Sequence, residues 1–239
     1  MNEIGLMVLL IGVCSLTYSF EIVFGLAGTI LMMPILGFAF ESKILVIYSL
    51  LPQMMVATIA LIRSYRKINI REWALMLASA TIGAIIGSYL FSYIPNDVFK
   101  RMLAIVIILG GIYLVISPDF RVGKKGRRMM DLFAGLSHSL FGISGPIVMS
   151  RLLGTFEDKT IIRNNAFLLY FGLNIVRAIN YQINDLITPN IWKMFAVSTP
   201  FLLLVLFFSD RLHFKISDQK FKRVVSWVIL LSGLIYFFR

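Results

Sequence analysis

Nine stretches of the chain contain no Asp, Glu, Lys or Arg, and this feature restricts the fold more than any other. A helix of about 20 residues crosses the hydrocarbon core of a bilayer. Across 239 residues, 59% are hydrophobic and 15% are charged, against about 25% charged in soluble domains. The sequence therefore excludes an ordinary soluble protein and predicts an all-α polytopic membrane protein. The stretches are 4–20, 22–40, 44–62, 73–96, 102–118, 132–150, 164–176, 194–209 and 224–238.

Parts of the first half of the chain recur in the second half. The segment FGLAGTILM at 24–32 returns 117 residues later as FGISGPIVM at 141–149, with the Phe, both glycines and the Met retained. The segment at 94–101 returns in the same order at 216–223. Matches that recur in the same order indicate an internal duplication.

The duplication divides the chain into two transmembrane repeats. We expect a first repeat at 1–120, a basic linker at 121–128 and a second repeat at 129–239. Trp73 and Trp192 begin the third helix of each repeat.

The basic residues predict how the repeats cross the membrane. If each glycine-containing segment enters and returns on one side, seventeen of the 23 Lys and Arg residues lie on that side, five lie on the other, and Arg177 lies inside a helix. Cytoplasmic loops of membrane proteins are rich in Lys and Arg. We therefore predict two inverted repeats, each with a glycine-broken helical hairpin and three transmembrane helices, giving 8–10 membrane segments. Both termini would lie outside a bacterial-type cytoplasmic membrane. The stretch 132–150 is also long enough for one straight crossing, so its length leaves the hairpin open.

The two glycine-containing segments are candidate binding sites. Broken helices at matching positions of inverted repeats bind substrate in many transporters, because the freed N–H groups of a half-helix point at a buried anion. The alternative is that the glycines only allow close helix packing. The candidate substrate-binding residues of the two segments are Gly25, Gly28, Thr29, Gly142, Ser144, Gly145 and Pro146.

Ionisable residues within apolar segments are further candidates, because a charge in the membrane is expensive. Glu21 and His138 each precede a motif glycine by four residues, so we expect them to face each other as a proton-coupling pair. Alternatively, Glu21 lies in water at a hairpin turn and His138 bonds a carbonyl group. Arg177, with Asn174 three residues before it on the same helix face, could bind an oxyanion. Alternatively, Arg177 snorkels or pairs with Glu21 or Asp185.

These glycine segments resemble the TauE/SafE sulfite exporter family, also called the TSUP family. The resemblance rests on Gly25-Leu26-Ala27-Gly28-Thr29 with Pro34, and on Gly142-Ile143-Ser144-Gly145-Pro146. Ala27 and Thr29 stand where glycine is usual in the family. The resemblance implies a secondary-active transporter of small sulfur-containing anions, such as sulfite or organosulfonates, driven by protons or another ion.

Other classes of function are less well supported by the residues. An anion channel could share the broken helices. An intramembrane lipid-modifying enzyme would need a nucleophile with a base or a metal site, whereas the chain has two histidines, one cysteine and no acidic pair with metal-ligand spacing. We therefore expect no enzyme activity, no metal and no cofactor. We expect the basic cluster at 124–128 to contact anionic lipid headgroups, with no nucleic acid as partner. The sequence leaves homo-oligomer formation open.

Overall fold

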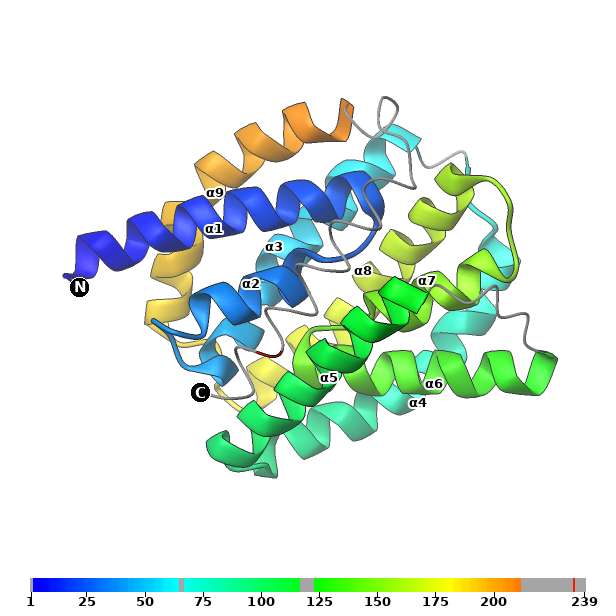
Figure 1. The fold of residues 1–239 in the computed structure, drawn as a ribbon, viewed down its shortest axis with the longest axis horizontal. Coiled ribbons are helices and arrows are strands. Elements are labelled where there is room, and N and C mark those ends of the chain that lie inside the picture. The colour runs from blue at the N-terminus through cyan, green and yellow to red at the C-terminus, as the bar shows by residue number, and fades with distance from the viewer. Residues whose placement is uncertain (1, 65–66, 117–122, 212–233, 235–239) are drawn as a thin grey trace.

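The computed structural model describes residues 2–64, 67–116, 123–211 and 234, and every regular element within them is a helix (Figure 1). Four of these helices, α1, α3, α4 and α9, are long and apolar enough to span a membrane. The predicted all-α polytopic membrane fold is thereby confirmed. The helices are α1 (Glu3–Phe24), α2 (Gly28–Leu36), α3 (Ser42–Ser64), α4 (Ile70–Tyr93), α5 (Asn96–Ile116), α6 (Lys124–Phe141), α7 (Gly145–Leu153), α8 (Lys159–Ile183) and α9 (Pro189–Ser209).

The order of long and short helices recurs along the chain. A long helix is followed by a nine-residue helix twice, as α1–α2 and as α6–α7. Three long helices follow the first pair, and two follow the second pair within the described residues. The short helices begin 117 residues apart, and so do α3 and α8. Trp73 and Trp192 are the fourth residues of α4 and α9. The predicted match at 216–223 and the last predicted helix of the second repeat lie outside the described residues.

The stretch 132–150 does not run straight. The structure divides it into α6, which ends at Phe141, and α7, which begins at Gly145. Its length alone was compatible with one crossing, but a left-handed residue at Gly142 ends the helix. α2 lies beside α1 in Figure 1, and each short helix contacts the long helix before it.

Contacts between the long helices fix their directions. Glu3 pairs with Lys193 at the start of α1 and α9, and Arg163 contacts both Ile22 and Asp210 at their other ends. α1 and α9 are therefore parallel. Tyr48 bonds to Ser198 and Arg63 pairs with Asp210, so α3 runs in the same direction as α9.

α4 and α6 run the opposite way. Lys43 at the start of α3 donates to the carbonyl of Phe91 near the end of α4, which makes α3 and α4 antiparallel. Gly83 of α4 faces Leu132 of α6 and Gly87 faces Leu136, so α4 and α6 are parallel to each other. α1 and α6 consequently run in opposite directions. In Figure 1, α1 with α9 and α4 with α6 form opposite faces of the molecule.

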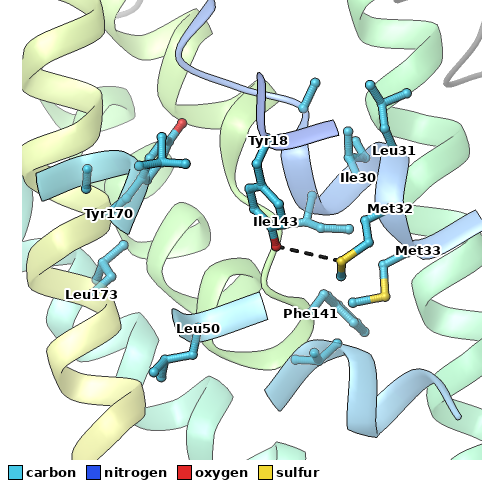
Figure 2. Packing of buried hydrophobic residues seen from close by; sticks show 14 of the residues in the cluster. Tyr18, Ile30, Leu31, Met32, Met33, Leu50, Phe141, Ile143, Tyr170 and Leu173 are labelled. Atoms are coloured by element: carbon cyan, nitrogen blue, oxygen red, sulfur yellow. Dashed lines mark hydrogen bonds between the residues drawn. The ribbon is translucent and has the colours of Figure 1, made fainter. Parts of the chain in front are cut away.

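The apolar core surrounds the two helix breaks. Figure 2 shows Met32 and Met33 of α2 packed close to Phe141 and Ile143, which flank the second break. Tyr18 of α1 is fully buried there, and its hydroxyl lies 3.8 Å from the sulfur of Met32. Both breaks thus lie in the protein interior.

Close packing through glycines occurs at the α4–α6 contact. A methyl group added to Gly83 would lie 1.9 Å from the carbonyl oxygen of Leu132, and one added to Gly135 would lie 1.8 Å from that of Ala80. Small residues allow such backbone approach in membrane helices. The sequence analysis considered this role only for the motif glycines.

We predict that Gly83→Ala destabilises the protein by about 2 kcal/mol or more, because rigid backbone must move apart to admit the methyl group. Thermal unfolding in detergent measures the effect. Gly172→Ala is the matched control: its methyl group would meet the flexible end of the Leu77 side chain, which can move. Equal melting temperatures for Gly83→Ala and the wild type would contradict the packing described.

Candidate anion site at the two helix breaks

The first break lies between α1 and α2. Gly25 ends α1 in the left-handed conformation, with φ of 76°, and its N–H donates to the carbonyl of Glu21 at 2.8 Å. Glycine adopts this conformation without steric cost. Ala27 also has a positive φ, of 93°, which is unfavourable for alanine. The departure from glycine noted at position 27 therefore falls where the backbone favours glycine.

The second break begins in the same way, although Ser144 before α7 has a φ of −138° where Ala27 has a positive φ. Gly142 ends α6 with φ of 70°, and its N–H donates to the carbonyl of His138 at 2.8 Å. Pro146 occupies the first turn of α7, where a missing N–H removes no helical hydrogen bond. Gly25 and Gly142 are thus equivalent in sequence position, conformation and hydrogen bonding.

Both breaks border one small cavity. Its volume of about 20 Å³ is enough for about one water molecule. Most of the predicted site residues line it, together with six residues that the sequence analysis did not assign to the site. The predicted residues are Glu21, Thr29, His138, Gly142, Ser144, Gly145 and Pro146, and the added ones are Leu26, Ala27, Ile30, Gln53, Ile143 and Tyr170.

Glu21 is buried beside the start of α2. Only 3% of its surface is exposed, so it does not lie in water at a hairpin turn. Its carboxyl group lies close to the backbone of Gly28 and Thr29, which begin α2. A methyl group on Gly28 would lie 1.9 Å from Glu21 Oε2. The Glu21 carboxyl group therefore already lies at the N-terminus of this short helix.

His138 lies on the other side of the cavity. Its Nδ1 is 3.0 Å from the Ser144 hydroxyl, and its Nε2 is 3.1 Å from Asn174 Oδ1. The ring stacks on Tyr170, with centroids 5.7 Å apart. The partners of His138 are a hydroxyl and a side-chain amide. Both His138 and Glu21 line the same cavity.

Arg177 is fully buried, and within the described residues it contacts no carboxylate. It is held behind Gly142: its Nη2 would lie 3.4 Å from a methyl group on that glycine. It does not line the cavity, and its partners include neither Glu21 nor Asp185. The acceptors of its N–H groups are Val46 O, Ser49 Oγ, Gln53 Oε1, Asn174 Oδ1 and Tyr181 Oη, at 2.7 to 3.3 Å.

Asn174 joins Arg177 to His138. Its Oδ1 accepts from Arg177 Nη1 at 2.9 Å and lies within hydrogen-bonding distance of His138 Nε2. Its Nδ2 is buried without a hydrogen-bond partner among the described residues. Asn174 and Arg177 lie on one helix face, as their spacing predicts, and are joined by a hydrogen bond.

Two residues that were not among the predicted site residues link the breaks reciprocally. Gln53 on α3 donates to the carbonyl of Gly142 at 2.9 Å and to Thr29 Oγ1 at 2.7 Å. Tyr170 on α8 donates to the carbonyl of Gly25 at 3.2 Å. Gln53 and Tyr170 are 117 residues apart, the same spacing as the two motifs. Each half of the chain thereby holds the broken backbone of the other half.

The described residues contain no group of three or more His, Cys, Asp or Glu side chains placed to hold a metal ion. The arrangement offers instead two helix N-termini, a carboxyl group, an imidazole and a buried guanidinium. These groups suit a small anion and a proton.

The fold and the two broken helices define a multi-pass helical membrane protein. A scan against protein-family models matches residues 9–236 to the family described as Sulfite exporter TauE/SafE. The chain belongs to this sulfite exporter family of membrane transporters, as the resemblance predicted. No curated protein and no solved structure that was compared matches the chain.

Proposed function

We propose that the protein moves small sulfur-containing anions, such as sulfite or organosulfonates, across the membrane by coupling them to protons. The observation that carries this proposal is the convergence of two short-helix N-termini on one buried cavity that also contains Glu21 and His138. Neutral or cationic cargo would gain little from such termini.

The positive charge of Arg177 supports an anionic cargo. A buried cation is costly unless an anion or several hydrogen bonds compensate it. Among the described residues, Arg177 has hydrogen bonds to neutral acceptors only, so its charge remains available to attract an anion into the adjacent cavity. We infer that Arg177 and Asn174 attract the cargo electrostatically without lining the cavity themselves, since Gly142 and Gln53 line it next to them.

The opposite directions of α1 and α6 support inverted repeats and transport by alternating access. Ion pairs also support the assignment of the basic loops to one side of the membrane. Arg63 and Arg163 with Asp210, Lys67 with Asp158, and Arg151 with Asp131 and Glu72 all join parts that were assigned to the basic side. We propose that this side faces the cytoplasm, that both termini face away from it, and that membrane lipids are the other partner.

The size of the cavity favours a carrier over a channel. A space for one water molecule does not admit a sulfite ion, so groups around the site must move before an anion binds. A carrier undergoes such a rearrangement in every cycle, whereas an open channel does not. We propose that the protein has no enzyme activity.

Transport of labelled sulfite into proteoliposomes, with and without an imposed pH gradient, tests the proposal. We expect saturable flux that the gradient stimulates. Flux that rises linearly with sulfite concentration would favour the channel. Absence of flux for sulfite, thiosulfate and an organosulfonate would contradict the proposed function.

We predict that Glu21→Gln and His138→Ala uncouple transport from protons. Each variant loses a titratable group at the cavity, so we expect the ratio of flux with the gradient to flux without it to fall to about one. Glu41→Gln, which neutralises an exposed carboxyl outside the cavity, is the control. Normal gradient-driven flux in both cavity variants would contradict the proton-coupling roles.

A further inference from the structure

The two equivalent helix N-termini differ in what faces them. Glu21, a potential anion, is close to the first N–H groups of α2. At α7, the residue in the equivalent position is His138, which contacts the Ser144 hydroxyl. The N-cap residue Ser144 makes no side-chain hydrogen bond to the backbone of α7. Only the first of the two termini therefore has a carboxyl group of the protein at its start.

The Glu21 carboxyl group is not fully hydrogen-bonded. Its Oε2 is buried and has no hydrogen-bond partner within the described residues. An unpartnered buried oxygen is unfavourable, so the carboxyl is not fixed in place on all sides. Glu21 also lines the cavity, which has space for about one water molecule.

A sulfite ion has four heavy atoms and does not fit in that space. A neighbouring group must move before an anion can reach the start of α2. The Glu21 carboxyl lies directly against the Cα of Gly28, where an anion bound by these N–H groups would have to lie. Two negative groups at one helix terminus would also repel each other.

We propose that the Glu21 carboxyl group, when ionised, is a tethered anion that occupies the N-terminus of α2 when no substrate is bound, and that the substrate oxyanion binds by displacing it. The inference rests on the proposed function and adds a specific competitor for its binding site. Glycine at position 28 leaves room for the Glu21 carboxyl group at the start of α2. A side chain there would overlap Glu21 Oε2 and the Tyr18 ring, at 1.9 and 2.7 Å.

Calorimetric titration of the full-length protein in detergent with sulfite, at one fixed pH, tests the competition. Glu21→Gln removes the negative charge but keeps the size of the side chain. We expect it to bind sulfite about tenfold more tightly than the wild type, because a charge at a partly buried helix terminus contributes an energy of that order. Glu21→Ala is a second neutral variant with the same expected direction, should the first fail to fold.

Two controls separate competition from other effects of the substitution. Glu21→Asp keeps the charge, so we expect no gain in affinity. Glu41→Gln makes the same chemical change at an exposed position, and we expect wild-type affinity. If Glu21 had only a structural role, its neutralisation would lower the melting temperature without increasing the affinity for sulfite.

The outcomes distinguish the inference from the proposed function. If the wild type binds sulfite and the neutral variants bind it equally or more weakly, the competition is refuted while the anion site stands. If neither the wild type nor any variant binds sulfite, the proposed function fails and the inference fails with it.

Discussion

Replacing Arg177 with alanine is expected to weaken sulfite binding at least about 30-fold and to abolish saturable transport. A unit charge about 6 to 8 Å from an anion contributes about 2 to 3 kcal/mol at an effective dielectric constant of 20, and 1.4 kcal/mol corresponds to a tenfold change in affinity. Calorimetric titration with sulfite and flux in proteoliposomes measure the two effects. Arg177→Lys keeps a charge but loses the fork of five N–H groups, so we expect an intermediate result.

Loss of Arg177 also leaves its hydrogen-bond acceptors unsatisfied, which lowers stability. A control variant is needed to separate this loss of stability from the loss of positive charge. Arg163 is a second buried arginine on α8, but it pairs with Asp210 at 3.0 Å. Arg163→Ala should therefore lower the melting temperature while affinity for sulfite stays within about twofold of the wild type. Equal affinity in Arg177→Ala and the wild type would refute the role of this charge.

Gly142→Ala is expected to eliminate transport and to destabilise the protein by about 2 to 5 kcal/mol. The φ of 70° is unfavourable for alanine. The new methyl group would lie 2.9 Å from Ser49 Oγ and 3.4 Å from Arg177 Nη2, and tight cores resist such additions. Displacing these groups also disturbs the bond from Gln53 to the carbonyl of residue 142.

Gly12→Ala is the matched control for this substitution. Gly12 lies within α1, and an added methyl group has nothing within 4 Å. Alanine is the better helix former by about 1 kcal/mol, so we expect unchanged transport and equal or higher stability. If Gly142→Ala melts and transports like Gly12→Ala, the second break does not need its left-handed residue.

The sequence predicts the helix breaks well because their cause is local. Gly25 and Gly142 recur in matching motifs, and glycine readily adopts the left-handed conformation that ends a helix. Segment length gave less information. The stretch 132–150 satisfies the length test for one crossing, yet it contains a break, because length does not report where a helix ends.

The contacts of Arg177 could be predicted only in part. Its pairing with Asn174 follows from helical spacing and occurs in the structure. The position of Arg177 behind Gly142, outside the cavity lining, depends on how α8 packs against α3 and α6. Such packing between distant segments is not encoded in local spacing.

Gln53 and Tyr170 were not assigned to the site because each is an ordinary residue on an apolar helix. The signal that could have found them is the repeat itself, since a spacing of 117 residues relates them as it relates the motifs. The α4–α6 contact has a partial signal in the sequence, because Gly83 and Gly87 are separated by three residues, a spacing that allows close helix packing. That spacing does not identify the partner helix, and the approach of Gly135 to Ala80 emerges only when the two helices are placed side by side.

The location of a bound anion is the most direct test of the site. Selenite is the selenium analogue of sulfite, and anomalous scattering from its selenium atom would locate it in crystals of the full-length protein. We predict a selenium peak between the starts of α2 and α7, with the Glu21 carboxyl moved away from Gly28. A peak only among the basic residues around Arg151 and Arg163, or no peak at concentrations that saturate transport, would contradict an anion site at the two helix breaks.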